Sequence, residues 1–284
     1  MEPTQLSWLF VFYKMNTINQ KPIGIFDSGL GGLTVAKAIN LTLPNENIIY
    51  FGDTAHLPYG DKSKETIIQY STRIADFLIE QECKMIVIAC NSASANAYPE
   101  VLEKAGNKAL VMNVIDPVVS YISQNDYKKV GVIGTKSTID SNTYEDKINA
   151  VKKGVSVSSM ATPLFVPMIE EGFIFDDISN AIIRNYLSRN DLDDIESLIL
   201  GCTHYPIIKN QISKFFNFEV EIIDSGKIVA NSVRNMLSEQ NLLNESKTAA
   251  DKKFYLSDFT RYFKQIARMF FEEEIELVRL DFWK

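Results

Sequence analysis

The sequence predicts an α/β fold of two pseudo-symmetric halves, each with a largely parallel central sheet and with the active site in the cleft between them. Short apolar, β-branched runs alternate with segments of helical periodicity, a pattern typical of parallel strands covered by helices. One apolar run that stops at a cysteine occurs in two variants, Met85–Cys90 and Leu198–Cys202. Both cysteines therefore belong at the carboxyl ends of buried strands, where open α/β sheets bind ligands.

The spacing along the chain indicates an internal repeat. From the first strand of each half to its cysteine there are 64 residues (Phe26 to Cys90) and 69 residues (Ile133 to Cys202). Such near-equal spacing favours two related α/β units rather than one continuous sheet.

In the first half, the apolar runs predict strands over residues 22–26, 48–51, 85–89 and 109–114, the last ended by Asp116 and Pro117. Helical spacing predicts a helix that ends near residue 40 and helices over 63–81 and 92–104. The loop 27–32 is rich in glycine and leads into a helix, which makes an anion site plausible. Its glycine spacing differs from that of the dinucleotide-binding fingerprint.

In the second half, we expect strands over 129–134, 197–201 and 220–224, and helices over 137–151, 176–187 and 227–239. Residues 163–167 form an apolar piece bounded by prolines, and 244–253 read as a polar linker. The amphipathic tail 254–270 is expected to return to the first half. The predicted division is an N-terminal extension (1–20), a first domain (21–115 plus 225–284) and a second domain (116–224).

The N-terminal extension lacks a basic region and a small-residue cleavage site, so a signal peptide is not expected, and Met15 is an alternative start. The net charge of -7 and the pI near 5.1 argue against a nucleic-acid partner. No apolar segment reaches the roughly 20 residues that span a bilayer. Three cysteines form an odd, sparse set, which favours reduced thiols in the cytoplasm over a disulfide framework.

Cys90 and Cys202 are the first candidates for chemistry. A thiol has a reference pKa near 8.5, and both precede an expected helix start, which favours the thiolate. Three other interpretations remain: buried structural cysteines, a redox disulfide between the two, or a metal site that includes His204. The metal site is disfavoured because the usual ligand spacings are absent.

Four residues are candidates to orient or reprotonate the thiols: Asp27, Asp53, Glu170 and His204. Each has a plainer alternative; Asp27, for example, would also serve as a helix N-cap. A further set of hydroxyls and amides would supply neutral donors to an amino-acid carboxylate, although each alone is more often a cap or turn former: Ser28, Asn91, Ser92, Thr135, Thr138 and Thr203.

Together these motifs resemble those of bacterial glutamate racemases in the aspartate/glutamate racemase superfamily, in order and spacing from Lys21 to the end. The resemblance is carried by Asp27-Ser28-Gly29-Leu30-Gly31-Gly32, Pro58-Tyr59-Gly60, Cys90-Asn91-Ser92-Ala93, Phe165-Val166-Pro167 with Glu170, and Gly201-Cys202-Thr203-His204-Tyr205-Pro206.

The resemblance implies racemisation of glutamate without a cofactor, by two-base proton transfer between Cys90 and Cys202. It implies that Asp27 and Asp53 assist Cys90, and that Glu170 and His204 assist Cys202. It implies substrate binding by Asp27, Ser28, Tyr59, Gly60, Asn91, Ser92, Thr135, Thr138, Thr203 and His204. It further implies a cytoplasmic homodimer that supplies D-glutamate for peptidoglycan synthesis.

The sequence departs from the family pattern at two positions. Ser92 stands where threonine is usual and keeps the hydroxyl, while His56 stands where arginine is common. Two other functions remain open: a related enzyme that acts on aspartate, a hydantoin or a malonate, and a non-catalytic amino-acid-binding protein. A pyridoxal-phosphate racemase is disfavoured because no motif singles out a Schiff-base lysine.

Overall fold

A computed structural model describes residues 18–246, 248–259, 261–271 and 274–284, so most of the predicted N-terminal extension lies outside the described residues. The larger sheet has the strand order β10-β9-β2-β1-β3-β4, and every registered pair in it is parallel. Its strands are β1 (Ile23–Asp27), β2 (Ile48–Gly52), β3 (Met85–Ile88), β4 (Leu110–Asn113), β9 (Lys252–Leu256) and β10 (Leu277–Arg279).

The smaller sheet has the order β6-β5-β7-β8 and is also parallel throughout. Its strands are β5 (Lys129–Gly134), β6 (Ser156–Ala161), β7 (Ser197–Gly201) and β8 (Glu221–Ile223). The order β2-β1-β3-β4 in the larger sheet repeats as β6-β5-β7-β8, so β3 and β7, which precede the two cysteines, occupy equivalent positions. The predicted α/β class with parallel sheets is confirmed.

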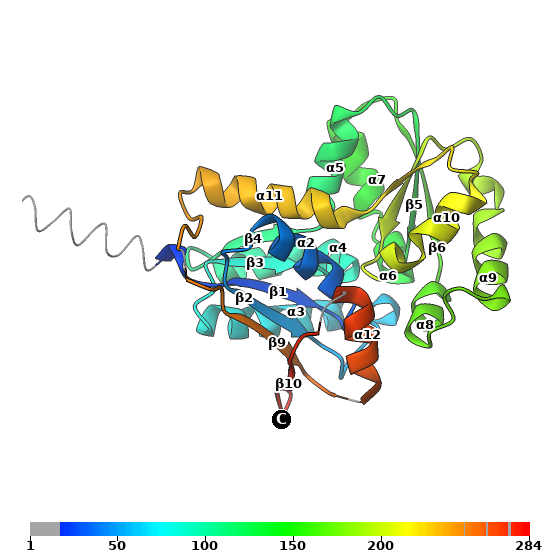
Figure 1. Ribbon diagram of the computed structural model, residues 1–284. Helices are drawn as coiled ribbons and strands as arrows, with labels where there is room; N and C mark the ends of the chain where they lie inside the picture. Colours follow the sequence, from blue (N-terminus) through cyan, green and yellow to red (C-terminus); the bar gives the residue numbers. More distant parts are fainter. Residues whose placement is uncertain (1–17, 247, 260, 272–273) are drawn as a thin grey trace, which may run out of the picture.

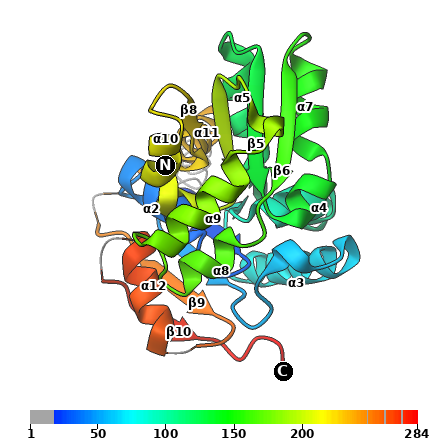
Figure 2. The ribbon, with the colours of Figure 1, turned by 90° about the vertical axis from the view of Figure 1, so that its right-hand side faces the viewer.

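Helices connect the strands and cover the sheets (Figure 1). They are α2 (Leu33–Thr42), α3 (Lys64–Glu80), α4 (Asn91–Ala105), α5 (Ile115–Gln124), α6 (Lys136–Asp140), α7 (Thr143–Val151), α8 (Phe165–Glu170), α9 (Asp177–Leu187), α10 (Lys209–Phe215), α11 (Ser225–Glu239) and α12 (Arg261–Phe271), with short 3-10 turns at Tyr59–Asp61, Asn190–Leu192 and Tyr205–Ile208. Figure 2 looks from the side of α8 and α9, with the smaller sheet above and β9 and β10 below.

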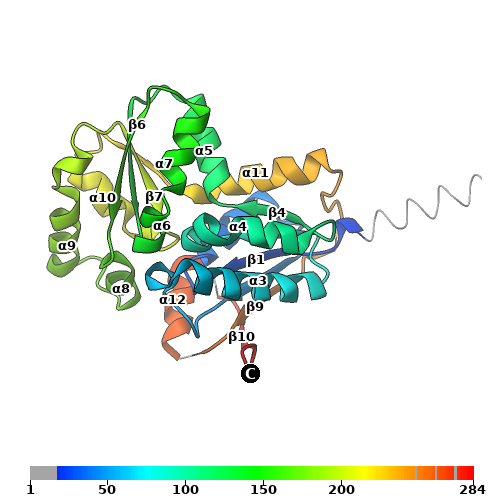
Figure 3. The same ribbon diagram turned by 180° about the vertical axis from the view of Figure 1, so that it is seen from behind.

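Side-chain alternation along the larger sheet explains why helices lie on both of its faces. Ile23 and Ile25 of β1 belong to the apolar core that also includes α2, α11 and α12, on the face toward the viewer in Figure 1. Phe26 belongs instead to the core with α3 and α4, which lie in front of the sheet in Figure 3. Strand positions buried on both faces account for the continuous apolar runs in the sequence.

The chain returns to the larger sheet near its end. β9 pairs with β2 and β10 pairs with β9, so the tail extends the sheet on the side away from β3. This return agrees with the expectation for the tail, although β9 begins inside the segment predicted as a polar linker. The exact domain boundaries stay a prediction.

Other elements also differ from the sequence-based expectation. The helix predicted over 137–151 is divided into α6 and α7, and β10 was not predicted. α5 includes Asp116 and Pro117, which were predicted only to end a strand: Asn113 accepts hydrogen bonds from the Ile115 and Asp116 amides, and a proline in the first turn needs no amide partner. The proline-bounded piece forms helix α8, in which Pro167 likewise lies in the first turn and needs no amide partner. The unpredicted strand β6 lies at a sheet edge and is rich in serine. The short helix α10 was also not predicted.

Candidate active site

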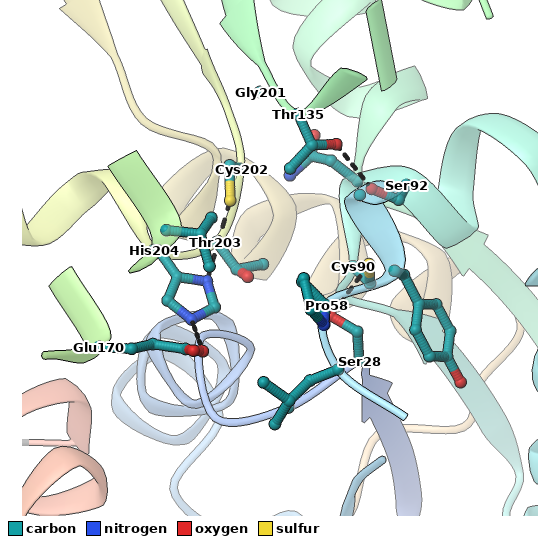
Figure 4. A pocket seen from close by; sticks show the side chains of 16 residues that line it. Ser28, Pro58, Cys90, Ser92, Thr135, Glu170, Gly201, Cys202, Thr203 and His204 are labelled. Carbon is teal, nitrogen blue, oxygen red and sulfur yellow. Dashed lines mark hydrogen bonds and ion pairs between the residues drawn. The ribbon is translucent and has the colours of Figure 1, made fainter. Parts of the chain in front are cut away.

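A pocket lies where the carboxyl ends of strands from both sheets face each other (Figure 4). From the first half it is lined by Ser28, Gly29, Leu57, Pro58, Tyr59, Gly60, Cys90, Asn91 and Ser92, and from the second half by Thr135, Val166, Glu170, Gly201, Cys202, Thr203 and His204. The structure thus brings both predicted thiols into one site. Of the predicted site residues, Asp27, Asp53 and Thr138 stand behind this lining.

Cys90 follows β3 and is the N-cap residue of α4. Its thiol donates a hydrogen bond to Ser28 Oγ at 3.6 Å. Burial, and then the nearby charge of Asp27, raise the pKa of Cys90 to about 12, although the Ala93 amide and the Ser28 hydroxyl act in the opposite direction. The protonated thiol is therefore the resting form of Cys90 at neutral pH.

Asp27 ends β1 and is fully buried beside this thiol. The Gly29 amide donates to Asp27 Oδ2 at 2.9 Å, and Thr203 Oγ1 donates to Oδ1 at 3.3 Å. Burial raises the pKa of Asp27 above its usual value, while the charge of His204 and the amides of Gly32 and Gly29 limit the rise. An acid of raised pKa is better matched to proton exchange with a thiol than an ordinary carboxylate is.

Cys202 follows β7 and begins a chain of three side chains. Its sulfur lies 3.8 Å from His204 Nδ1, and His204 Nε2 lies 2.9 Å from Glu170 Oε1, as the dashed lines in Figure 4 show. Burial alone would lower the pKa of His204, but its hydrogen bonds to Cys202 and Glu170 and their charges raise it well above 6.5. The protonated imidazole therefore has one N–H facing the Cys202 sulfur and the other facing Glu170.

The imidazole of His204 is held from two further sides. Phe270 of α12 packs edge-on against it, with ring centroids 5.3 Å apart. A Cβ added to Gly31 would lie 2.5 Å from His204 Nδ1 and 2.5 Å from Thr203 Oγ1. The predicted glycine-rich loop is therefore used for close approach between the halves.

Three hydroxyls form a cluster where α4 meets the smaller sheet. Ser92 Oγ lies 2.9 Å from Thr135 Oγ1 and 3.3 Å from Thr138 Oγ1, and the two threonine oxygens are 3.1 Å apart. Thr135 is also the N-cap of α6, so its predicted capping and site positions coincide. Since each hydroxyl is both donor and acceptor, the cluster can turn donors toward a bound carboxylate.

Asn91 carries an unused donor at the pocket wall. Tyr144 of α7 donates from its hydroxyl to Asn91 Oδ1 at 2.8 Å. Asn91 Nδ2 is buried and has no hydrogen-bond partner within the described part of the chain. No local pattern points to a site role for Tyr144, because its partner lies 53 positions away in the other half.

Asp53, which the resemblance implies assists Cys90, does not line the pocket. Its carboxylate accepts hydrogen bonds from Tyr59 OH and Ser257 Oγ, each at 2.7 Å, and from Trp283 Nε1 at 2.7 Å. The closer His56 contact, Nδ1 to Asp53 Oδ2, measures 3.0 Å. Among the hydrogen bonds of the described residues, none joins the Asp53 side chain to Cys90. The Asp53 amide donates at 3.0 Å to the carbonyl of Asp27, the acid beside that thiol.

Two negative findings apply to the described residues alone. No helix among them is long and apolar enough to cross a membrane. They also contain no group of three or more histidine, cysteine or acidic side chains placed to hold a metal ion.

Comparison with known proteins places this site in a family. Residues 28–233 match the Asp/Glu/Hydantoin racemase family. A glutamate racemase from Chlorobium phaeobacteroides is 41% identical over 264 residues, which are 92% of this chain and 96% of that protein. One from Neisseria meningitidis serogroup C is 38% identical over 93% of this chain and 99% of the relative.

The fold comparison agrees. A crystal structure of glutamate racemase from Francisella tularensis in complex with D-glutamate has a TM-score of 0.88 and 42% identity, covering 93% of this chain and 99% of that one. The resemblance predicted from the motifs is confirmed. The chain therefore belongs to the Asp/Glu/Hydantoin racemase family and, within it, to the glutamate racemases.

Proposed function

We propose that this chain interconverts L- and D-glutamate by two-base proton transfer at Cα, with Cys90 and Cys202 as the two acid/base residues and without a cofactor. The observation that carries the proposal is that the two thiols, which follow equivalent strands of the two sheets, line one pocket. Inversion of a stereocentre by proton transfer requires a base on one side of Cα and an acid on the other. The complex of a 42% identical relative with D-glutamate supports the choice of substrate.

The two thiols start from different protonation states. The Cys202 sulfur, paired with the imidazolium of His204, takes the proton from Cα, so that the C–H bond breaks and an S–H bond forms. The electron pair left on Cα then takes the proton of the Cys90 thiol from the opposite side, which leaves Cys90 as thiolate. In the reverse direction the Cys90 thiolate takes the proton from Cα, and the Cys202 thiol returns a proton from the other side. Between successive turnovers in one direction, Cys90 regains a proton from solvent and Cys202 releases one to solvent, with Asp27 and His204 as the neighbouring groups through which these exchanges pass.

The supporting residues divide between the two thiols. We propose that Glu170 and His204 hold Cys202 in its reactive form, and that Asp27 does the same for Cys90. Backbone and side-chain donors in the pocket would bind the glutamate carboxylates and stabilise the charge that develops next to Cα. We propose that these donors come from eight of the predicted substrate-binding residues: Ser28, Tyr59, Gly60, Asn91, Ser92, Thr135, Thr138 and Thr203.

Single substitutions of the thiols test the mechanism. Cys90→Ser and Cys202→Ser should each lower kcat by at least about a thousandfold, because a serine hydroxyl is a far weaker acid than a thiol, yet glutamate should still bind. Circular dichroism would follow racemisation, and calorimetry would measure binding. Cys83→Ser is the matched control, since Cys83 is buried outside the pocket. Full activity of either pocket variant would refute the two-base assignment.

Deuterium exchange distinguishes the remaining candidate functions. In D₂O without added cofactor, both glutamate enantiomers should exchange their α-proton. Exchange of aspartate or another acid instead would favour a different member of the family, and binding without exchange would favour an amino-acid-binding protein.

We further propose that the enzyme is a cytoplasmic homodimer whose D-glutamate is used in peptidoglycan synthesis. The family resemblance supports all three parts. Rescue of a bacterial strain that requires D-glutamate would test the physiological role, and light scattering of the purified protein would test the dimer. Failure of rescue by an active enzyme, or a mass near 32.2 kDa, would contradict the respective part.

A further inference from the structure

A network of side chains joins the C-terminal segment to the loop that forms one wall of the pocket. This loop, residues 53–60, follows β2, and its last four residues line the pocket. Asp53 is the first residue of the loop, and its side chain is 0% exposed. Its Oδ2 accepts from Tyr59 OH, within the loop, and its Oδ1 accepts from Trp283 Nε1, one residue before the end of the chain.

The tail is fixed where it meets the loop. The guanidinium of Arg73 in α3 lies 4.9 Å from the centre of the Trp283 ring, and Arg73 Nη2 donates to the Phe282 carbonyl at 3.0 Å. The Trp283 ring meets His56 edge-on at 4.6 Å, and His56 stacks on Tyr70 of α3 at 4.1 Å. Figure 3 shows the C-terminus beside β10, below α3. The indole therefore sits on a packed surface with its N–H directed at Asp53.

A second connection joins the base of the loop to the residues after β9. Thr54 Oγ1 donates to the Asp258 carbonyl at 2.6 Å, and the Asp258 amide donates back to Thr54 Oγ1 at 2.9 Å. Ser257 Oγ accepts from the Ala55 amide at 2.9 Å and donates to Asp53 Oδ1 at 2.7 Å. Two separate parts of the tail thus meet at one buried carboxylate.

The far end of the loop has little freedom to move without changing the pocket. A Cβ on Gly60 would lie 2.5 Å from Thr135 Cβ, so the loop touches the opposite half directly. Burial, and then the Asp53 charge, raise the pKa of Tyr59 well above its usual value, which keeps its hydroxyl as the donor to Asp53. A shift of Asp53 would be passed through Tyr59 to Gly60.

We propose that Trp283 is a positioning residue: its indole N–H orients Asp53, which through Tyr59 holds the pocket loop in its substrate-binding position. The effect on glutamate rests on the function proposed above; the effect on the loop does not. Asp53 in this arrangement is an anchor for the loop and acts on Cys90 only through the shape of the pocket.

Trp283→Phe tests the proposal, because it removes the N–H donor and keeps a smaller aromatic ring in the packed tail. We expect KM for glutamate to rise about three- to tenfold in both directions with kcat changed less than about twofold, the result of losing binding shared by ground state and transition state. Hydrogen exchange of the amides in residues 53–60 should become faster, with no change in β5. Ser257→Ala, which removes a second donor to the same oxygen, should act in the same direction.

Lys284→Ala is the matched control, since its ammonium pairs only with the exposed Asp281 among the described residues. It should leave KM and the loop exchange unchanged. An unchanged KM in Trp283→Phe, or a fall in kcat alone, would overturn the proposal. If the wild-type protein did not racemise glutamate, the proposed function would fail, and the exchange rate of residues 53–60 would still decide whether Trp283 holds the loop.

Discussion

The bond between Tyr144 and Asn91 decides how a single amide faces the pocket. The tyrosine hydroxyl donates to Asn91 Oδ1, so the amide nitrogen, which is buried and unpaired within the described residues, is the unused donor of a residue that lines the pocket. Burial raises the pKa of Tyr144 above its usual range, which keeps the hydroxyl protonated as a donor. An Asn amide that is held in one orientation gives a defined donor at no further cost when the ligand arrives.

Tyr144→Phe should therefore weaken glutamate binding. It leaves Asn91 Oδ1 without its donor and lets the amide turn, so we expect KM to rise about tenfold with a much smaller change in kcat. Steady-state kinetics in both directions would measure this. Tyr121→Phe is a control, since its hydroxyl bonds to Glu221 on the surface. Equal KM values for Tyr144→Phe and the wild type would show that Asn91 needs no such support.

At the residue scale, the sequence predicted the site where local pattern and chemistry coincide. Cys90 and Cys202 end apolar runs, and His204 lies two residues past a thiol, so their neighbourhood follows from parallel sheet geometry. Tyr144 and Trp283 were not predicted, because a helix face and a chain end give no local signal of what they will contact. The hydrogen-bond donors to the Asp53 carboxylate likewise include a residue 230 positions away in the sequence.

At the scale of elements, the predicted strands were found inside both sheets and at the edges formed by β4 and β8, but the edge strand β6 was missed. β6 has the sequence Ser156–Ala161 and is only partly buried, so no apolar run marks it. α5 was missed because a proline at position 117 is usually taken to end a regular element. In the structure Pro117 lies in the first turn of the helix, where a proline is tolerated, and Asn113 accepts a hydrogen bond from an amide of that turn. Capping partners depend on the three-dimensional turn, which the pattern of apolar residues does not describe.

A buried ion pair holds the start of β3 to its neighbours. Lys84 Nζ lies 2.6 Å from Glu46 Oε2, with both side chains 1% exposed, and it also donates to the Leu242 carbonyl at 2.8 Å. Glu46 Oε1 accepts from the Asn244 amide at 2.8 Å. The pair thus connects the loop before β2 with the segment that follows α11.

Lys84→Met should lower the free energy of unfolding by about 3–5 kcal/mol, because Glu46 would be left buried without its cation. Adding Glu46→Leu should recover much of the loss, since an apolar pair of similar volume carries no desolvation cost. Urea unfolding would measure both. Lys21→Met is the comparison: its pair with Glu82 is exposed, and its loss should cost less than about 1 kcal/mol. A similar cost for the two lysine substitutions would contradict this account.

At the scale of the whole molecule, the two halves share strand order but differ in chemistry. Strand β1 ends in Asp27 where β5 ends in Gly134, and the residue after β2 is Asp53 where Thr162 follows β6. The amides of Asp53 and Thr162 nevertheless make equivalent bonds to the strand-end carbonyls, at 3.0 and 2.8 Å. The repeated backbone therefore places the two thiols at equivalent positions, while the side chains around them differ: Asp27 lies beside Cys90, and His204 with Glu170 beside Cys202.

Buried groups with raised pKa values make the stability of the fold decrease as pH rises. Burial raises the pKa of both Cys83 and Cys90 to about 12, well above that of an ordinary thiol, so at alkaline pH the folded protein keeps two protons that the unfolded chain releases. A raised pKa contributes stability that is complete below the unfolded value and is lost as pH rises toward the folded value. His204, with its pKa raised well above 6.5, acts in the same direction from lower pH.

The free energy of unfolding should consequently decrease above pH 9, by up to about 1.4 kcal/mol per pH unit for each thiol. Cys83→Ala isolates one contribution, because Cys83 lies outside the pocket. The cavity that Cys83→Ala creates should lower the free energy of unfolding equally at all pH values. Because the variant lacks the Cys83 thiol, its free energy of unfolding should decrease less steeply between pH 9 and 10 than that of the wild type. Urea unfolding under reducing conditions at several pH values would measure the slope of the free energy of unfolding against pH for both proteins. Equal slopes for the wild type and Cys83→Ala would show that burial does not hold the Cys83 proton.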